Sequence, residues 1–485
     1  LVSMGNKADL NETDFLKALA NDPETRVIVC YLESIVDGQG FMKVAEQAAE
    51  KKPVVIFKSG ITAAGGRAAA SHTGSLAGAD IAYGAAFRRS GVIRAETFEA
   101  MFDYARALAN QPLPKGPRVA VITNAGGPGI MAADAVEQAG LTLNRLTESI
   151  AKELATQLPA AASVGNPVDV LGDADAARYA AAVRAVGSDS TIDAMIVLLT
   201  PQAMTDSRKT ALAIAQECAG GTKPVLVSFM GGSDVLAGRQ ALTEAGVPSY
   251  DSPERAVSAL RAMRDYSDWL RRPPRIVTRF PVNRRRVERI VRRHLRSRHF
   301  QVGEAAAKDI LRAYNFRVPA GDLASDAEEA VEIAGRIGYP VAMKISSPDI
   351  VHKSDLGGVK LFIGSPAEVR DAFDLMLLRI RQRVPEAKIT GVYVEKMCGK
   401  GREVILGMTR DPQFGPMLMF GLGGIFVEVL KDVTFHIAPI THQESLQMLY
   451  STRSYALLKG VRGEARVDID AIATSLQRIS QLVTD

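Results

Sequence analysis

Short apolar runs alternate with amphipathic stretches from residue 1 to residue 270. Runs such as Val54–Phe57, Ala194–Leu199 and Val225–Phe229 are largely apolar, which is typical of strands buried on both faces of a parallel sheet. Between such runs, apolar residues recur at helical spacing, for example from Phe98 to Asn110. The alternation predicts α/β domains with doubly wound parallel sheets.

The first domain is expected over residues 1–114, because the Pro-rich stretch 110–117 has the composition of a linker. Strands are expected at Val27–Leu32 and Val54–Phe57. In open sheets of this type, ligands bind beyond the carboxyl ends of strands. Glu33 follows the first of these strands, and a histidine-bearing stretch follows the second, so both are expected at one edge of the sheet.

That stretch, residues 58–78, surrounds His72 almost entirely with small residues. It buries little apolar surface, so a structural role in a core is hard to assign to it. The composition predicts a close-approach loop with one titratable, nucleophilic group at its centre. The alternative is a loop histidine that only hydrogen-bonds backbone. Its polar and glycine neighbours are candidate phosphate contacts: Ser71, Thr73 and Gly74.

A second α/β domain is expected over residues 115–270. Its first strand, Val119–Ile122, leads into a glycine-rich turn that opens a helix. The exposed N–H groups and the dipole of a helix start favour an anion, so Gly126 and Gly127 are candidate phosphate contacts. Many turns between a strand and a helix are rich in glycine, so this motif alone is weak.

Positive charge is concentrated in residues 271–300, which hold twelve arginines and one acid, Glu288. The formal net charge of the 485-residue chain is only +5. Pro273 and Pro274, followed by apolar residues at helical spacing, predict an interdomain linker and then a solvated helix. A basic segment can also bind nucleic acid. No aromatic platform or base-reading motif accompanies it, so we expect no nucleic-acid partner.

The remaining composition bears on the compartment. No apolar run approaches the ~18 residues of a membrane-spanning helix. The N-terminus lacks the basic and apolar regions of a signal peptide. Cys30, Cys218 and Cys398 are odd in number and far apart, which excludes a disulfide framework and suits a reducing cytoplasm. We therefore expect a cytoplasmic protein without a membrane partner.

A third domain is expected over residues 301–485. The strand "GYPVAMKISS" carries Lys344, a loop with Gly357 and Gly358 follows, and "VYVEKM" and "REVILG" come next. A lysine for phosphates, a glycine flap, an acidic hinge and a downstream glutamate are what nucleotide binding between two sheets requires. This arrangement resembles the ATP-grasp fold. A generic α+β domain is the alternative.

The ATP-grasp resemblance implies roles for these positions. Lys344 would contact the nucleotide phosphates, and Glu403 would suit the ribose. The hinge between the lobes would meet the adenine, with these residues: Val394, Glu395, Lys396 and Met397.

Further motifs extend the resemblance over the whole chain. "GITAAGGRAAASHTGS" is similar to the phosphohistidine loop of the succinyl-CoA synthetase α-subunit, and "TNAGGPGI" with "NPVDVLGDA" is similar to the carboxy-terminal domain of its β-subunit. "SMGNKADL", "YLES", "HKSDLGGVKL", "DPQFGP", "GLGGIFVEVLKDV" and "GVRG" match motifs of one family. In content and order, the chain resembles the ADP-forming acyl-CoA synthetases, also called NDP-forming acetate–CoA ligases. This resemblance implies two flavodoxin-like, succinyl-CoA synthetase-like domains followed by an ATP-grasp domain.

The family resemblance implies a reaction in which acyl-CoA and phosphate give an acyl phosphate and CoA. His72 would take the phosphoryl group with Glu33 as its orienting carboxylate, since a neutral imidazole is a good nucleophile near pH 7. His352, in "HKSDLGG", would relay the group to ADP. The implied cofactors are ATP or ADP, Mg²⁺ and coenzyme A; the implied partner is a carboxylic acid or acyl-CoA, and the implied assembly is a homo-oligomer, a dimer.

The chain departs from the family pattern at both ends. We expect a CoA-binding domain before Leu1 and a magnesium-binding stretch after Asp485, so the chain resembles a truncated fragment and the metal ligands stay unknown. The runner-up function is a synthetase-like effector-binding module of a GNAT-fused protein lysine acetyltransferase. Because such relatives tend to lose the phosphohistidine, the presence of His72 and His352 favours the synthetase. The sequence does not identify the acid or the purine preference.

Overall fold

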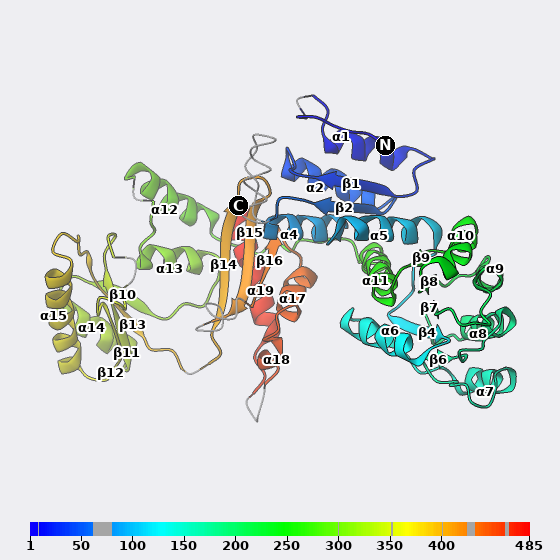
Figure 1. Ribbon diagram of the computed structural model, residues 1–485. Helices are drawn as coiled ribbons and strands as arrows, with labels where there is room; N and C mark the ends of the chain where they lie inside the picture. Colours follow the sequence, from blue (N-terminus) through cyan, green and yellow to red (C-terminus); the bar gives the residue numbers. More distant parts are fainter. Residues whose placement is uncertain are drawn as a thin grey trace. The chain divides into compact units, whose positions relative to one another are not determined.

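The computed structural model describes residues 1–7, 9–61, 80–298, 300–350, 353–399, 401–423, 432–460 and 465–485 (Figure 1). The chain divides into two compact units. The first consists of Leu1–Pro274 and Arg410–Gly415, and the second of Arg275–Thr409 and Pro416–Asp485. Within the described residues, no helix is both long enough and apolar enough to cross a membrane.

The first domain of the first unit is built on a parallel sheet of order β1-β2-β3. Its central strand is buried along Val54, Val55 and Ile56, as the apolar run predicts. Asn11 caps the first helix by accepting a hydrogen bond from the Thr13 amide at 2.8 Å. The elements are α1 (Glu12–Asn21), β1 (Ile28–Leu32), α2 (Gly38–Ala49), β2 (Val54–Lys58), α4 (Asp80–Ser90), β3 (Ile93–Ala95) and α5 (Phe98–Asn110).

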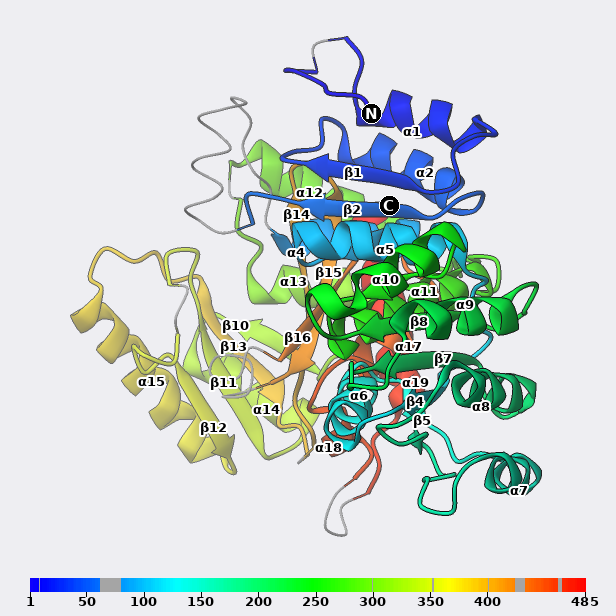
Figure 2. The same cartoon turned by 45° about the vertical axis from the view of Figure 1, so that its right-hand side comes forward.

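The second domain has a parallel sheet of order β5-β4-β7-β8-β9, with β6 beside β4. Its central strands β4, β7 and β8 are buried almost throughout because helices cover each face of the sheet, as Figures 1 and 2 show. Ile122 and Val197 pack toward one hydrophobic cluster, whereas Val121 and Leu198 pack toward the other. The elements are β4 (Arg118–Thr123), α6 (Gly126–Gln138), β5 (Thr142–Leu143), α7 (Glu148–Gln157), β6 (Val168–Asp169), α8 (Ala176–Ser188), β7 (Ala194–Leu199), α9 (Ser207–Cys218), β8 (Val225–Phe229), η1 (Ser233–Val235), α10 (Leu236–Glu244), β9 (Ser249–Tyr250) and α11 (Pro253–Leu270).

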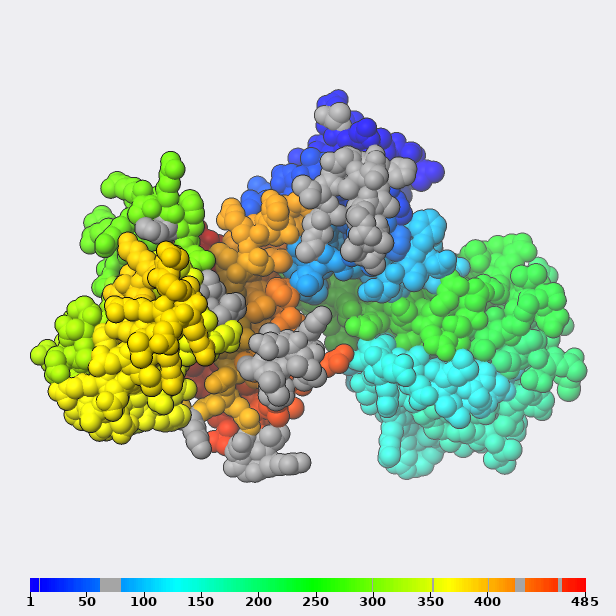
Figure 3. Space-filling view, turned by 60° about the vertical axis from the view of Figure 1, so that its left-hand side comes forward, coloured from blue at the N-terminus to red at the C-terminus, as the bar shows by residue number. Residues whose placement is uncertain are grey.

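The two domains of the first unit share a hydrophobic core along α11. Val55 of the first sheet, Val121 of the second and Leu260 of α11 belong to one buried cluster. Beside it, the buried Asp103 carboxylate accepts hydrogen bonds from the Arg255 guanidinium at 2.7 and 2.9 Å. The space-filling view shows the cyan-to-green residues of the second domain as a continuous mass (Figure 3). The predicted doubly wound parallel sheets are confirmed.

The second unit begins with a half that is antiparallel. The sheet has the order β10-β13-β11-β12, and α14 and α15 pack against it. Figure 1 shows these two helices together beside the sheet. The elements are α12 (Arg284–Arg296), α13 (Glu304–Ala313), β10 (Gly321–Ala324), α14 (Ala327–Ile337), β11 (Val341–Ser346), β12 (Val359–Ile363), α15 (Pro366–Arg383) and β13 (Gly391–Lys396).

The other half of the second unit has the sheet β14-β15-β16, packed against α17 and α19. Arg275, the first residue of the unit, donates to the Glu444 carboxylate at 3.0 and 2.9 Å and so fixes the entering chain to α17. The expected ATP-grasp architecture of two α/β lobes is confirmed. The elements are β14 (Val404–Asp411), β15 (Gly415–Leu422), β16 (Val433–Ile437), α17 (His442–Tyr450), α18 (Tyr455–Leu458) and α19 (Ile469–Thr484).

Candidate active site

Glu33 lies at the carboxyl edge of the first sheet, where the sequence predicts it. It follows β1 directly and is partly exposed. Because Leu32 is in register with Lys58, the two strands end side by side, and the Ser59 amide donates to the Leu32 carbonyl at 3.0 Å. The stretch that carries the predicted histidine therefore begins beside Glu33. His72 itself lies outside the described residues, together with Ser71, Thr73 and Gly74.

A buried lysine marks the same edge. The side chain of Lys58, the last residue of β2, is 3% exposed and its ammonium lies 4.6 Å from the centre of the Tyr83 ring. Its ammonium also donates to the Ser59 carbonyl. Burial lowers the pKa of Lys58, while the carboxylates of Asp80 and Glu33 act in the opposite direction. A positive charge thus lies under the start of the His72 stretch, near Glu33.

The aromatic ring beside Lys58 is held by the turn Arg410–Gly415, which belongs to the first unit. The Tyr83 hydroxyl donates to the Gln413 side-chain oxygen at 3.0 Å, and the Gln413 amide donates to the Ile35 carbonyl at 2.9 Å. Phe414 meets Tyr83 edge to face, with ring centres 5.1 Å apart. The "DPQFGP" motif therefore holds Tyr83 in place beside Lys58, at the carboxyl edge of the first sheet.

The glycine-rich turn of the second domain opens α6, as predicted. Gly126 and Gly127 are exposed, and a Cβ atom at either position would meet nothing within 4 Å. No side chain caps this helix start, so its N–H groups are available to an anion. Asn124, just before the turn, joins the ends of β4 and β7 by accepting from the Thr200 amide at 2.9 Å.

In the second unit, Lys344 belongs to a buried group of charges that we call the lysine–glutamate cluster. Its ammonium lies 2.9 Å from Glu304 Oε1 and 2.5 Å from Glu395 Oε1. Lys353 Nζ lies 2.7 Å from Glu304 Oε2, and Lys308 bridges Glu304 and Glu395. These side chains are only 8 to 27% exposed. Three ammonium groups and two carboxylates leave the cluster with one net positive charge.

The cluster shifts the ionisation of its members. Burial would raise the pKa of Glu304, but hydrogen bonds from Lys353 and Lys344 outweigh burial and lower it to about 2. Burial also lowers the pKa of Lys308, and the Glu304 carboxylate opposes that change. Glu304 is therefore ionised throughout the physiological pH range.

The predicted glycine flap is a tight turn against β11. Gly357 has a φ of +75°, which favours glycine, and the Gly358 amide donates to the Lys353 carbonyl at 2.7 Å. A Cβ atom at Gly358 would come within 2.5 Å of Ile345 Cγ2. Backbone contact at this turn thus fixes where Lys353 lies. His352, one residue earlier, lies outside the described residues.

The predicted hinge lies at the end of β13, the strand between β10 and β11. Val394 and Glu395 are buried, and the amides of Lys396 and Met397 donate to the carbonyls of Ala320 and Pro340 at 2.8 and 3.1 Å. Those two N–H groups are therefore already engaged. An adenine at this position would have to meet other groups of the hinge.

Glu403 precedes β14 and is exposed, with its carbonyl accepting from the Gly423 amide at 2.8 Å. The Asp432 carboxylate accepts hydrogen bonds from the amides of Arg453 and Ser454 at 2.9 and 2.7 Å. Within the described ranges, no group of three or more potential ligands could hold a metal ion. We therefore assign no metal ligand.

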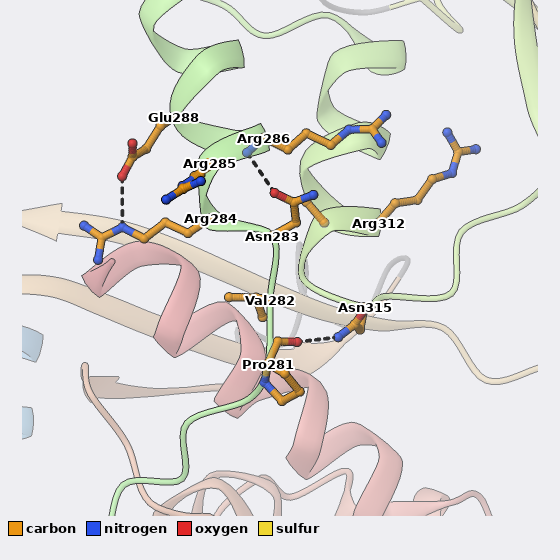
Figure 4. A pocket seen from close by; sticks show the side chains of 10 residues that line it. Pro281, Val282, Asn283, Arg284, Arg285, Arg286, Glu288, Arg312 and Asn315 are labelled. Carbon is orange, nitrogen blue, oxygen red and sulfur yellow. Dashed lines mark hydrogen bonds and ion pairs between the residues drawn. The ribbon is translucent and has the colours of Figure 1, made fainter.

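The arginine-rich segment forms α12, which buries none of its residues, as expected of a solvated helix. Its start borders a hollow of about 810 Å³ (Figure 4). Arg284 pairs with Glu288 at 3.0 Å, and Arg286 and Arg312 both pair with Asp309. Part of the positive charge of this segment is thus neutralised by nearby carboxylates. The expectation that the segment binds no nucleic acid stays a prediction.

Sequence reasoning missed Glu304, Lys308, Lys353 and Lys58. The first two form a Glu-x-x-x-Lys pair on α13, a spacing that usually indicates only a solvent-exposed helical pair. Lys353 directly follows His352 in the sequence, and Lys58 ends an apolar run. Both positions could therefore have been noted as candidate site residues. Which groups these four side chains contact depends on how the elements pack and could not be inferred from the sequence.

Three family models match this chain. A succinyl-CoA ligase-like flavodoxin domain matches residues 1–108, a ligase-CoA domain matches residues 119–275, and an ATP-grasp domain matches residues 293–485. These limits agree with the predicted order of the domains.

Relatives that align with the whole chain agree with the three family models. The chain is 44% identical to acetate–CoA ligase [ADP-forming] I of Archaeoglobus fulgidus and 41% identical to 4-hydroxybutyrate–CoA ligase [ADP-forming] of Nitrosopumilus maritimus. Both alignments cover 100% of this chain and 70% of the relative.

Among solved structures, acetyl-coenzyme A synthetase 1 of Candidatus Korarchaeum cryptofilum, in complex with phosphate and ADP, is similar with a TM-score of 0.53 and 38% identity. That match covers 56% of this chain and 59% of the other. The apo form of the same protein gives a TM-score of 0.53 and 37% identity.

Proposed function

Because this chain belongs to the family of ADP-forming acetate–CoA ligases, we propose that it interconverts acyl-CoA, ADP and phosphate with a carboxylic acid, ATP and CoA. The relatives are named for different acids, acetate and 4-hydroxybutyrate among them, so we propose a carboxylic acid without naming which one. Those relatives give no support to the alternative of an effector-binding module fused to an acetyltransferase.

The observation that carries this proposal is the lysine–glutamate cluster. Lys308, Lys344 and Lys353 converge on two carboxylates in a largely buried setting with net positive charge. Such a setting suits the phosphates of a nucleotide, because charge-assisted hydrogen bonds are strong where water is excluded. The ADP and phosphate complex of the similar synthetase supports the same ligand class.

We propose that the first half of the reaction occurs at the edge formed by Glu33 and Lys58. A ring nitrogen of His72 would attack the phosphorus of an acyl phosphate, so that the N–P bond forms and the P–O bond to the carboxylate breaks. Glu33 would hold the imidazole tautomer and stabilise the cation that forms. The buried ammonium of Lys58 would favour the incoming phosphoryl charge at the same edge.

The phosphoryl group would then pass from His72 to His352 and from His352 to a terminal oxygen of ADP. Each step breaks one N–P bond and forms one new bond to phosphorus, and the reverse direction starts from ATP. Lys344 would hold the nucleotide phosphates, the hinge Val394–Met397 the base and Glu403 the ribose. The open helix start at Gly126 and Gly127 would hold a phosphate of the first half-reaction.

Magnesium would neutralise phosphate charge during nucleotide binding. The described residues offer no set of ligands for it, and Asp432 is committed to backbone amides. None of the steps above is therefore assigned to a metal ligand of this chain.

The test is ATP formation from ADP and phosphate, driven by acetyl-CoA or 4-hydroxybutyryl-CoA. The proposal predicts activity that falls by at least about a thousandfold in His72→Asn and in His352→Asn, as for other removed nucleophiles. Glu328→Gln is a matched surface control, because Glu328 is 69% exposed and pairs only with Arg370 among the described residues. Full activity in either histidine variant would contradict the proposal.

A further inference from the structure

One side of α12 carries a row of arginines that no described carboxylate pairs with. Their neighbours on the same helix are paired. Glu288 contacts Arg284 at 3.0 Å and Arg292 at 3.9 Å. Asp309 contacts Arg286 at 3.0 Å. The remaining arginines of the helix recur every three or four residues, so they lie on one side of it. We call them the arginine row: Arg285, Arg289, Arg293 and Arg296.

The arginine row lies opposite the half-buried side of α12. Val287, Ile290 and His294 are half-buried and recur at helical spacing, and the period of the helix places the row on the other side. Like charges four residues apart destabilise a helix, so Arg285 and Arg293 each repel Arg289 between them. An anion bound along the row would remove this repulsion.

The surface along the row is hollowed in two places. A hollow of about 680 Å³ is lined by the whole row together with Glu288, Arg292 and Ser297. The hollow of about 810 Å³ at the start of α12, drawn in Figure 4, adjoins it, because Arg285 and Glu288 line both. The helix rises about 16.5 Å from the first arginine of the row to the last. The row therefore borders an extended groove rather than a point-like pocket.

The residues that line the two hollows select a ligand class. Arginine, glutamate and serine alone line the smaller hollow, and none of the described residues that line either hollow is aromatic. A nucleobase would need an aromatic surface to stack on, and a peptide would need apolar pockets for its side chains. Guanidinium groups recognise phosphate through pairs of hydrogen bonds. The row is too long for one phosphate, so it suits a linear chain of phosphates.

We propose that the arginine row and its two hollows form a binding site for inorganic polyphosphate. The phosphate chain lies along α12, and each guanidinium group of the row neutralises phosphate charge and releases counterions. This site does not overlap the lysine–glutamate cluster. Arg312 and Ala313, at the end of α13, line the larger hollow, whereas Glu304 begins that helix. The inference therefore goes beyond the proposed function and does not depend on it.

The experiment measures binding of sodium polyphosphate to the whole chain by calorimetry. If the four arginines of the row contact phosphates, the affinity should fall by about fiftyfold when the salt concentration rises from about 50 to 200 mM. Changing all four arginines to glutamine should lower the affinity at the lower salt concentration by at least about thirtyfold. Glutamine is a good helix former, and α12 buries none of these side chains, so we expect the variant to fold.

A matched control removes the same number of positive charges elsewhere. It changes four exposed arginines, each paired with a carboxylate, to glutamine, and its affinity should stay within about threefold of the parent, since a paired arginine on another surface contacts no bound phosphate. The control positions are Arg184, Arg261, Arg336 and Arg370. If the fourfold variant of the row does not fold, Arg289→Gln combined with Arg293→Gln replaces it, with an expected loss of about fivefold.

Four results would overturn the inference. The first is no binding of polyphosphate at the lower salt concentration. The second is an equal loss in the row variant and in the control, which would show that only net charge matters. The third is tighter binding of a single-stranded RNA with the same number of phosphates, which would identify a nucleic-acid site. The fourth is equal binding of poly-glutamate of the same charge, which would show that the groove does not select phosphate.

Discussion

The carboxylate of Glu304 lies 2.7 Å from the ammonium of Lys353, although the two residues come from different elements, a helix and a turn. Because Glu304 also contacts Lys344, this ion pair brings the neighbour of His352 to the lysine expected at the nucleotide phosphates. The structure therefore connects the two features that the sequence presents as separate motifs.

Low pH should reduce the stability of the second unit because it protonates Glu304. Its pKa in the folded state is about 2, below the ordinary value of 4.5, so the stabilisation is present above about pH 4.5 and is lost as pH falls toward 2. The difference in free energy of unfolding between the wild type and Glu304→Gln should stay constant from pH 7 to 5. Below pH 5 this difference in free energy of unfolding should decrease by roughly 1 kcal/mol per pH unit.

Hydrogen exchange of the β11 amides measures this difference within the second unit. The single tryptophan, Trp269, lies in the first unit and would not report it. A difference that does not change between pH 5 and pH 3 would show that Glu304 is not held ionised by its lysines.

The turn at Gly358 should tolerate no side chain. A Cβ atom there would lie 2.5 Å from Ile345 Cγ2 and 3.0 Å from the Lys353 carbonyl, so Gly358→Ala must displace the turn. We expect a loss of about 1 to 3 kcal/mol in stability and slower labelling of His352.

Gly335→Ala is the matched control for this substitution. Gly335 lies within α14, and a Cβ atom there meets nothing within 4 Å. It should be neutral or stabilise the protein by about 0.5 to 1 kcal/mol, because glycine is unfavourable inside a helix. Equal effects of the two substitutions on urea unfolding would contradict the close contact of Gly358 with Ile345.

Much of the architecture could be predicted because it depends on local pattern. The apolar runs of β7 and β8 and the helical period of α5 determine those elements almost to the residue. Glu33 could be placed because parallel strands end at one edge of a sheet. Glu304 and Lys353 could not be paired, since they are 49 residues apart and their contact depends on the antiparallel sheet order. A lysine in an apolar strand, such as Lys58, gives no sign of which ring or carbonyl it meets.

The three cysteines should differ in reactivity. Burial raises the pKa of the Cys30 and Cys218 thiols to about 12, whereas Cys398 is exposed. Iodoacetamide at pH 8 should therefore alkylate Cys398 first, and the half-buried Cys30 and Cys218 more slowly. Peptide mass spectrometry measures the order. Equal labelling of all three cysteines in the native protein would contradict the burial of the two thiols.

Glu33→Gln should slow phosphorylation of His72 without preventing that of His352. The amide keeps the shape but cannot stabilise an imidazolium, which in other enzymes costs on the order of 10²- to 10⁴-fold. Glu50→Gln, an exposed position at the end of α2, is the control. Labelling of both histidines from γ-labelled ATP measures the effect, and an unchanged rate at His72 would exclude Glu33 as its orienting carboxylate.

The two-histidine relay is tested most directly by mapping the phosphoryl group after a single turnover with γ-labelled ATP. Peptide mass spectrometry under alkaline conditions preserves phosphohistidine and locates it. The relay predicts label at His352 and His72 in the wild type, at His352 alone in His72→Asn, and at neither position in His352→Asn. Label at His72 in the His352→Asn protein, formed at the wild-type rate, would show that the second histidine is not on the route.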